Sequence, residues 1–182
     1  PAMNENRGPL ETTIALMADH MQPFALEAPI EVAPLENPSP NRFRRVYRAM
    51  SGVLTADYAA MVDSRLGSPK WSKELWAHYT EAPPDPRYAE LAAEIVAELP
   101  AEYLDNPIAK AFAISGWLSK EGIYSLKNEH GGAEDPTASF LFGDLTGYCV
   151  HFSHAATYLM RSAGVPARVA TGYAVSESAR QG

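Results

Sequence analysis

The sequence is poor in the features that mark several common classes of protein. It contains one cysteine, Cys149, so no disulfide bond can form within the chain. No run of apolar residues approaches the roughly 20 that a helix needs to cross a bilayer. Basic residues are in the minority, because 15 Lys and Arg stand against 22 Asp and Glu and give a formal net charge of −7. This charge disfavours nonspecific binding to nucleic acid.

The composition that remains is typical of a globular protein. Hydrophobic residues make up 46% of the 182 residues, which is enough for one domain with a core, or for one domain with an appendage. The clearest linker is the proline-rich run Pro83-Pro84-Asp85-Pro86. We therefore predict an N-terminal extension over residues 1–82 and a second region over residues 83–182.

The first part of the extension is predicted to be irregular. Residues 1–10 are polar and indicate an extended lead. The apolar residues from Leu10 to Met21 favour a short helix that ends before Pro23. The prolines that follow, up to Pro40, break regular structure, so this stretch is expected to wrap the protein as an extended segment.

Helical patterns dominate after that segment. Residues 43–50 are basic and half apolar, which favours a surface helix or an edge strand, and contact with lipid headgroups or a partner is the weaker alternative. Helical spacing of apolar residues returns over residues 54–66 and 71–79. A helix is predicted over residues 88–99. Another begins with Asn106 as its N-cap and Pro107 at its first position, and a short strand is predicted at residues 123–126.

One stretch, residues 147–169, organises the rest of the chain. Its apolar residues recur at offsets of 0, 3, 4, 7, 8 and 11 from Phe152, which predicts one face of a helix. Gly164 stands where a C-terminal cap belongs, and Pro166 prevents the helix from continuing. Residues 167–173 alternate loosely and include β-branched side chains, so a strand is expected there.

Cys149 falls in the first turn of this predicted helix. Unpaired N–H groups and the positive end of the helix dipole lie there, and both favour the thiolate over the thiol. The same N–H groups suit an oxyanion formed when a thiolate attacks an acyl carbon. Helical geometry places Cys149 on the side of Phe152 and Met160, so its side chain is expected to face inward. His151 and His154 are expected on the opposite side, out of reach of the sulfur.

The motif around Cys149 resembles the core of the transglutaminase-like family, which belongs to the papain-like cysteine enzyme superfamily. The matching residues are Gly147-Tyr148-Cys149, Phe152-Ser153, the run from Leu159 to Val169, and Thr171-Gly172-Tyr173. The similarity extends upstream to about Tyr79 and is greatest to bacterial domains carried by membrane-anchored proteins. It implies that Cys149 is the nucleophile. It also suggests that the parent protein acts on the extracytoplasmic side of a bacterial membrane.

The resemblance implies an α+β fold, with a mainly helical N-terminal portion packed on an incomplete antiparallel sheet and the nucleophile at a helix N-terminus. The implied reaction is acyl transfer or hydrolysis on glutamine side-chain or peptide amides, through a thioester at Cys149, with a protein or peptide as substrate. No cofactor or metal is expected. A non-catalytic protein-binding module of the same family is the alternative.

The family's catalytic histidine and aspartate follow the Gly-Tyr strand, whereas this chain ends at Gly182. The chain therefore resembles the N-terminal part of the domain and is expected to be inactive by itself. The strand near residues 167–175 would then lack a neighbour. An unpaired strand edge invites pairing with another chain, so self-association is expected.

Other chemistry-bearing residues have less specific patterns. The Cys-x-His-x-x-His spacing at Cys149 is a poor zinc site, because the cysteine lies on the opposite helix side and structural zinc takes four ligands. His130 would meet the sulfur only if the fold brought its loop there. Tyr124 and Trp117 are open alternatives for an additional oxyanion donor, with core packing the default for each.

Two charged features complete the inventory. Glu129, Glu134 and Asp135 lie in one loop, where a solvated turn is favoured over a calcium site because the ligand pattern is not organised. Arg168 is expected to pair with a carboxylate or with backbone carbonyls near the helix.

Overall fold

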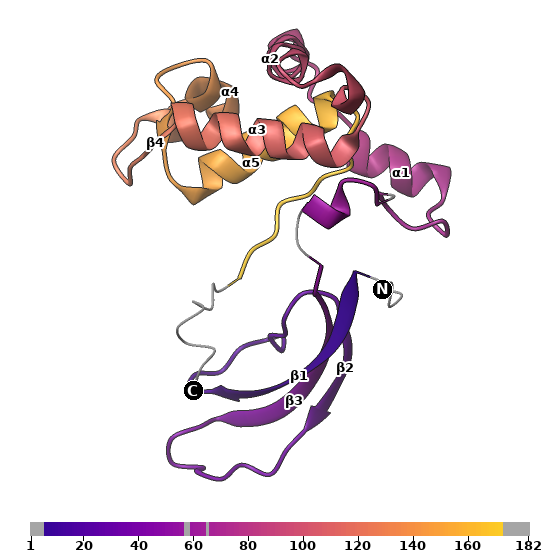
Figure 1. The fold of residues 1–182 in the computed structure, drawn as a ribbon. Helices are drawn as coiled ribbons and strands as arrows, with labels where there is room; N and C mark the ends of the chain where they lie inside the picture. Colours follow the sequence, from indigo (N-terminus) through magenta and orange to yellow (C-terminus); the bar gives the residue numbers. More distant parts are fainter. Residues whose placement is uncertain (1–5, 57–58, 65, 173–182) are drawn as a thin grey trace. The chain divides into compact units, whose positions relative to one another are not determined.

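The computed structural model describes residues 6–56, 59–64 and 66–172. The described residues form two compact units (Figure 1). The first contains the described residues up to Met61 together with Gly172, and the second contains those from Val62 to Thr171. Strands make up most of the first unit and helices most of the second. The predicted α+β class is therefore confirmed, although helices and strands are distributed along the chain differently from the prediction.

The first unit is an antiparallel sheet of three strands. β1 (Arg7–Leu16) and β2 (Pro29–Pro34) both pair with the central strand β3 (Arg45–Leu54). On β3, Val46, Tyr47, Ala49 and Ser51 are buried. The register is fixed by hydrogen bonds along the full length of β1, from Arg7 opposite Leu54 to Leu16 opposite Arg45.

The prediction of a mainly helical N-terminal portion is wrong for this unit. The helix expected from Leu10 to Met21 is a strand up to Leu16, because Thr12, Thr13 and Ile14 suit a pleated surface and β3 lies alongside. The wrapping segment contains β2, an outer strand with prolines at both ends, where a missing N–H is tolerated. Residues 43–50 lie largely in the central strand, neither a surface helix nor an edge.

The expected helical stretch over residues 54–66 is reduced to the 3-10 turn η1 (Ala59–Met61) in its described part. The pattern that follows becomes helix α1 (Lys73–Thr80), with Ser72 as its N-cap. Gly67 lies in the left-handed region, with φ of 73°, and its Cα faces the rings of Trp71 and Trp76. A side chain at Gly67 would strain the backbone and collide with these rings.

The second unit contains the two helices that the capping signals predicted. α2 (Pro86–Ala97) begins after Asp85, and α3 (Pro107–Glu121) begins after Asn106. The Asn106 side chain accepts hydrogen bonds from the N–H groups of Ile108 and Ala109, as an N-cap should. α1 joins the same unit through the N–H of Ala167, which donates to the carbonyl of Tyr79. The predicted family-domain boundary at residues 82 and 83 stays a prediction.

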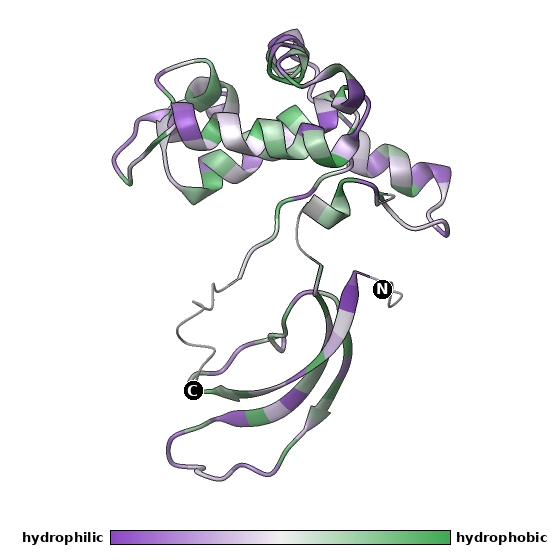
Figure 2. Cartoon of the chain, in the orientation of Figure 1, coloured by the Kyte–Doolittle hydropathy of each residue, from purple (hydrophilic) through white to green (hydrophobic). Residues whose placement is uncertain are grey.

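Helix α5 (Cys149–Ser162) runs through the middle of this unit and packs against α1, α2, α3 and the short helix α4 (Pro136–Leu141). The core between the helices is apolar, as the green segments of α3 and α5 show (Figure 2). Its buried residues are Tyr88, Ala92, Ile95, Ile114, Leu118, Ala138, Phe140, Leu141, Ala155 and Leu159. Burial of each large side chain contributes about 1.5–3 kcal/mol to folding.

The C-terminus of α5 follows the predicted stop signal. Gly164 has φ of 76°, its N–H donates to the carbonyl of Arg161, and the N–H of Val165 donates to that of Met160. These two bonds form a Schellman motif, which requires the left-handed conformation that glycine adopts without strain.

The second unit has a small sheet of its own. β4 (Ile123–Tyr124) pairs with β5 (Thr146–Gly147), and the two strands are parallel. The expected antiparallel pairing in this region is therefore wrong. The connection from β4 to β5 passes through the 3-10 turn η3 (His130–Gly132) and α4, and this crossover returns the chain in its original direction.

The strand predicted over residues 167–173 is absent from its described part, residues 167–172. The backbone there has other partners. Arg161 Nε donates to the carbonyl of Ala167, and the N–H of Ala167 donates to Tyr79. Tyr173 lies outside the described residues.

Candidate functional site

Cys149 is the first residue of α5, directly after the N-cap Tyr148. The predicted position in the first helical turn is thus confirmed. The predicted inward direction is wrong, because Cys149 is exposed. The buried face of α5 runs through His151, Ala155 and Leu159, and at 100° per residue Cys149 lies roughly 120° away from the middle of that face.

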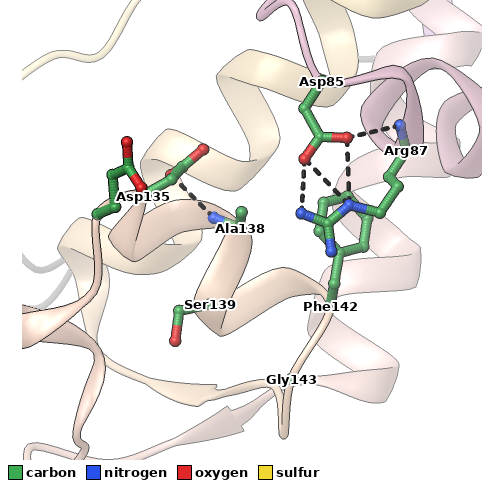
Figure 3. Close-up of a pocket in the computed structure, with 8 residues that line it drawn as sticks. Asp85, Arg87, Asp135, Ala138, Ser139, Phe142 and Gly143 are labelled. Carbon is green, nitrogen blue, oxygen red and sulfur yellow. Dashed lines mark hydrogen bonds and ion pairs between the residues drawn. The ribbon is translucent and has the colours of Figure 1, made fainter.

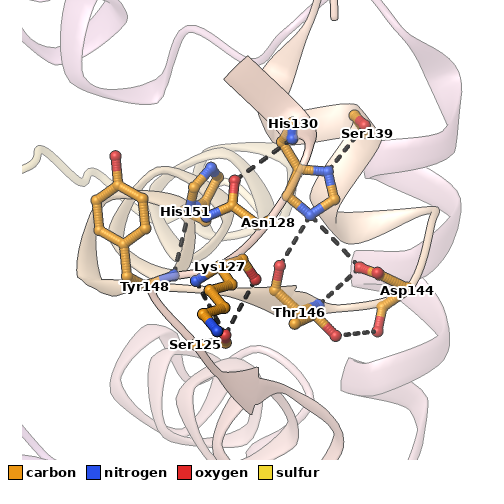
Figure 4. A network of polar contacts seen from close by, with 9 residues as sticks. All are labelled: Ser125, Lys127, Asn128, His130, Ser139, Asp144, Thr146, Tyr148 and His151. Carbon is orange, nitrogen blue, oxygen red and sulfur yellow. Dashed lines mark hydrogen bonds and ion pairs between the residues drawn. The ribbon is translucent and has the colours of Figure 1, made fainter. Parts of the chain in front are cut away.

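His151 occupies the inward position instead. It is 7% exposed, whereas the sequence pattern predicted the solvent side. Its Nδ1 lies 3.3 Å from the main-chain nitrogen of Tyr148 and accepts that N–H (Figure 4). The ring lies between three others, with centroid distances of 4.6 Å to Tyr148, 5.2 Å to His130 and 5.6 Å to Phe140. Aromatic neighbours and one backbone bond explain why a histidine is buried here.

Gly147 makes room for this imidazole. A Cβ at Gly147 would lie 2.9 Å from Cβ, Cγ and Nδ1 of His151, which is closer than real Cβ contacts. The glycine of the motif therefore permits the close approach of the His151 ring to the backbone that leads into α5.

His130 fixes the strand that precedes Cys149. Its Nε2 lies 2.9 Å from the carbonyl oxygen of Thr146, and its Nδ1 lies 2.9 Å from Ser139 Oγ (Figure 4). A carbonyl oxygen only accepts, so Nε2 carries the proton and Nδ1 of the neutral ring accepts from the Ser139 hydroxyl. Asp144 Oδ1 lies 3.4 Å from the same Nε2. The fold thus brings the loop of His130 to the cysteine turn, residues 147–149. Both ring nitrogens of His130, however, have partners other than the sulfur of Cys149.

The electrostatic surroundings of His151 favour its neutral form. Burial is the main cause that lowers its pKa from the ordinary value, and the nearby His130 and His154 lower it further. The Tyr148 N–H acts in the same direction, because only an unprotonated Nδ1 accepts it. Within the described residues no hydrogen bond or ion pair reaches the sulfur of Cys149.

Of the two aromatic candidates for an oxyanion donor, Tyr124 lies beside the cysteine turn. It pairs with Gly147 across the parallel strands, is 66% exposed, and stacks on Phe152 with 6.3 Å between ring centroids. Trp117 packs against the helical core instead. Among the described residues, no hydrogen bond or ring contact joins Tyr124 to Cys149.

A separate hollow of about 860 Å³ lies between the start of α2 and α4 (Figure 3). In it Arg87 is paired with Asp85 at 2.6 Å and stands over the Phe142 ring at 4.4 Å. Asp135 of the acidic loop uses both of its carboxylate oxygens in hydrogen bonds within the fold. Its Oδ1 caps α4 by accepting from Thr137 and Ala138, and its Oδ2 accepts from the Tyr88 hydroxyl.

Two further observations concern metals and membranes. Among the described residues, no three His, Cys, Asp or Glu side chains gather as a metal site would require. In the same part of the chain, every helix is too short or too polar to span a bilayer. Arg168 is exposed, and the helix contact expected of it is made by Arg161, which bonds the carbonyls of Ala167 and Glu81.

The sequence model of the Transglutaminase-like superfamily matches residues 89–182, which is just over half of the chain and includes the cysteine turn. The chain belongs to the transglutaminase-like superfamily. This superfamily member is 44% identical over 50 residues to a protein-glutamine gamma-glutamyltransferase of Pseudomonas aeruginosa, covering 28% of this chain and 7% of that protein. It is 38% identical over 80 residues to the uncharacterized protein YebA of Bacillus subtilis, covering 40% of this chain and 10% of that protein.

The chain therefore spans a tenth or less of the length of these curated relatives. A solved structure from Cytophaga hutchinsonii is similar at 16% identity and a TM-score of 0.43, covering 90% of this chain and 55% of that chain.

The sequence did not predict the structural roles of the two buried histidines, His130 and His151. For His151 a signal was present, because it stands at the third helical position, where a side chain that accepts the N-cap N–H completes half of a capping box. For His130 no local signal exists, since its partners Ser139 and Thr146 lie on other elements.

Proposed function

We propose that the parent protein is a cysteine enzyme that performs acyl transfer or hydrolysis on glutamine side-chain or peptide amides, with Cys149 as the nucleophile. One observation carries the proposal. The only cysteine in the chain is exposed at the first position of α5, inside the region that matches the superfamily.

The chemistry follows from that position. The Cys149 thiolate attacks the amide carbon, and the carbonyl oxygen becomes an oxyanion that the N–H groups of the first helical turn are oriented to receive. The C–N bond then breaks, the nitrogen takes a proton and leaves as ammonia or an amine, and a thioester remains on the sulfur. Water or a second amine attacks the thioester, loses a proton and releases the product. Tyr124 is the aromatic residue placed best to add a further donor.

These steps need a group that gives and takes protons. The resemblance assigns that role to a histidine, oriented by an aspartate, on strands that follow Tyr173. His130 and His151 are not candidates in the described arrangement, because His130 is bonded to Ser139 and Thr146 and His151 to Tyr148. We therefore expect almost no turnover from the isolated chain, whereas the parent protein should be active.

The substrate is expected to be a protein or peptide. The Pseudomonas relative is named as a protein-glutamine gamma-glutamyltransferase, which makes a glutamine side chain the first donor to test. Membrane anchoring of the parent protein and action on the extracytoplasmic side belong to the same proposal.

The test is detection of the thioester. The parent protein is incubated with a glutamine donor peptide and a fluorescent primary amine, and the acyl-enzyme is sought by mass spectrometry after an acid quench. The expected result is a peptide adduct on Cys149, ammonia release and amine incorporation, all lost in Cys149→Ala. Peptide binding with no adduct, unchanged in Cys149→Ala, would instead support the non-catalytic binding module.

A further inference from the structure

One buried titratable side chain lies in the same helical turn as Cys149 and takes no part in the proposed steps. His151 is 7% exposed and stands two residues after the cysteine. The main-chain N–H of Tyr148, the residue directly before Cys149, donates to its Nδ1 at 3.3 Å. This bond fixes the backbone where the chain enters α5.

The same bond determines the protonation state of the ring. A protonated Nδ1 carries a hydrogen and cannot accept from Tyr148, so the arrangement requires neutral His151 with its proton on Nε2. Gly147 supports the arrangement, since any Cβ there would lie 2.9 Å from Nδ1 and push the ring away. The histidine, the glycine and the N-cap residue therefore act together as one local unit.

The groups that face His151 decide how easily it gains a proton. His130 faces it from η3 with 5.2 Å between ring centroids, Tyr148 from the N-cap, and His154 from the next turn of α5. Phe140 of α4 is apolar. The carboxylate of Asp144 lies next to His130, 3.4 Å from its Nε2. A proton on His130 therefore opposes a second proton on His151.

We propose that His151 is a positioning residue for Cys149. Its neutral imidazole holds the turn of Tyr148 and Cys149 in the conformation that presents the sulfur, and protonation of Nδ1 releases this turn. In that step Nδ1 takes one proton from water, the Tyr148 N–H loses its acceptor, and no covalent bond changes. The functional meaning rests on the proposed role of Cys149, but the hydrogen bond and its titration are measurable without turnover.

The sign of the pH dependence follows from the surroundings. Burial and the two neighbouring histidines lower the pKa of His151 in the folded state below its ordinary 6.5, whereas the unfolded chain keeps the ordinary value. The unfolded state then binds more protons as the pH falls through this window. The contribution of the neutral ring is complete above pH 6.5 and is lost as the pH falls toward the folded-state pKa.

The first experiment is nitrogen NMR on the uniformly ¹⁵N-labelled protein. We expect His151 as the tautomer protonated on Nε2, and a Tyr148 amide signal that shifts with the titration of His151. In His151→Asn the Oδ1 atom replaces Nδ1 as an acceptor but does not titrate. In His151→Leu the space is filled without an acceptor. Exchange of the Tyr148 amide with solvent should rise roughly fivefold in the Leu variant, as for loss of one helix cap, and stay near wild type in Asn.

The second experiment follows alkylation of Cys149 by iodoacetamide between about pH 5 and pH 8, the range in which histidines titrate. The pH dependence of the wild-type rate should show two transitions, one from the titration of His151 and one from ionisation of the thiol. His151→Asn should show thiol ionisation alone. His154→Asn, a change one turn along the same helix, is the matched control. It should keep both titrations, with that of His151 moved to a higher pH because a neighbouring histidine that lowers its pKa is gone.

A proton on Nδ1 of His151 at neutral pH, or a Tyr148 amide that ignores its titration, would overturn the proposal even if the variants failed to fold. If both NMR results hold but the parent protein forms no thioester, the function proposed for Cys149 fails and the pH-dependent turn remains.

Discussion

The Nε2 atom of His130 lies 2.9 Å from the carbonyl oxygen of Thr146, three residues before the candidate nucleophile along the chain. With the second bond from its ring to Ser139, this imidazole joins η3, α4 and β5. His130 thus connects the loop before α4 to the strand that leads into α5. These bonds hold the backbone just before the start of α5 in place.

Replacement of His130 by alanine is expected to lower the free energy of unfolding by about 2 kcal/mol. The substitution leaves the partly buried Thr146 carbonyl and Ser139 hydroxyl without the His130 partner and opens a cavity where the buried ring was. Urea unfolding followed by circular dichroism measures the change. His78→Ala, on the exposed surface of α1, is the control and should stay within about 0.5 kcal/mol of wild type. Equal losses in the two variants would contradict a special role for the His130 bonds.

Tyr88 is expected to make the folded state sensitive to alkaline pH. Its side chain is 0% exposed and its hydroxyl donates to Asp135 at 3.1 Å. Burial, and then the Asp135 carboxylate, raise its pKa well above the ordinary value of 10. An unfolded tyrosine loses its proton near pH 10, so the free energy of unfolding should decrease as the pH rises above about 10.

The variant Tyr88→Phe tests this linkage. It should cost about 1 kcal/mol at neutral pH through the lost hydrogen bond, and its free energy of unfolding should fall less steeply above about pH 10 than that of the wild type. Tyr103→Phe serves as the comparison, because Tyr103 is 39% exposed. A wild-type stability that stays constant up to pH 11 would show that Tyr88 ionises in the folded protein without cost.

Cys149 is expected to react with iodoacetamide faster in the folded protein than in the urea-unfolded chain at the same pH. The side chain is exposed, and the positive end of the α5 dipole favours the thiolate that attacks the reagent. Rates of mass increase in the two states give the comparison. A folded rate equal to or below the unfolded rate would mean that the helix terminus does not activate the thiol.

Self-association through an exposed strand edge remains a prediction. The strand expected near residues 167–175 is absent from its described part, so the outer strands β1 and β2 of the N-terminal sheet are the edges to test. Light scattering at several protein concentrations should show an average mass that rises with concentration. At the same concentration the mass should be lower for Leu10→Lys, which places a charge on β1. Leu126→Lys, at a side chain 77% exposed outside the strands, is the control. A strict monomer at every concentration would disprove the prediction.

Local chemistry made the helices of the second unit predictable. Asp85 and Asn106 bond the first N–H groups of α2 and α3, and Gly164 adopts the left-handed conformation after α5. Each of these effects involves residues within a few positions of one another, so the sequence contains all the partners. The position of Cys149 at a helix start is a result of the same kind.

The strands of the first unit were not predictable in this way. Leu10 to Leu16 has apolar residues at spacings compatible with a helix. Only pairing with β3 makes it a strand, and the paired residues run from Leu10 with Ser51 to Leu16 with Arg45, far apart along the chain. Strand preference depends on the neighbours that a segment meets in space more than on the segment itself. The same reason explains why residues 167–172 are not a strand, since the backbone of Ala167 bonds to α1 and α5.

By itself the sequence determined the family, the single nucleophile candidate and the turn of helix that carries it. Only the tertiary structure decided which way the side chains of that turn point. The packing of His130 and Phe140 against the start of α5 draws His151 inward and leaves Cys149 exposed. A helical period gives the relative angles of residues around an axis, whereas the buried direction depends on what other elements bring to that axis.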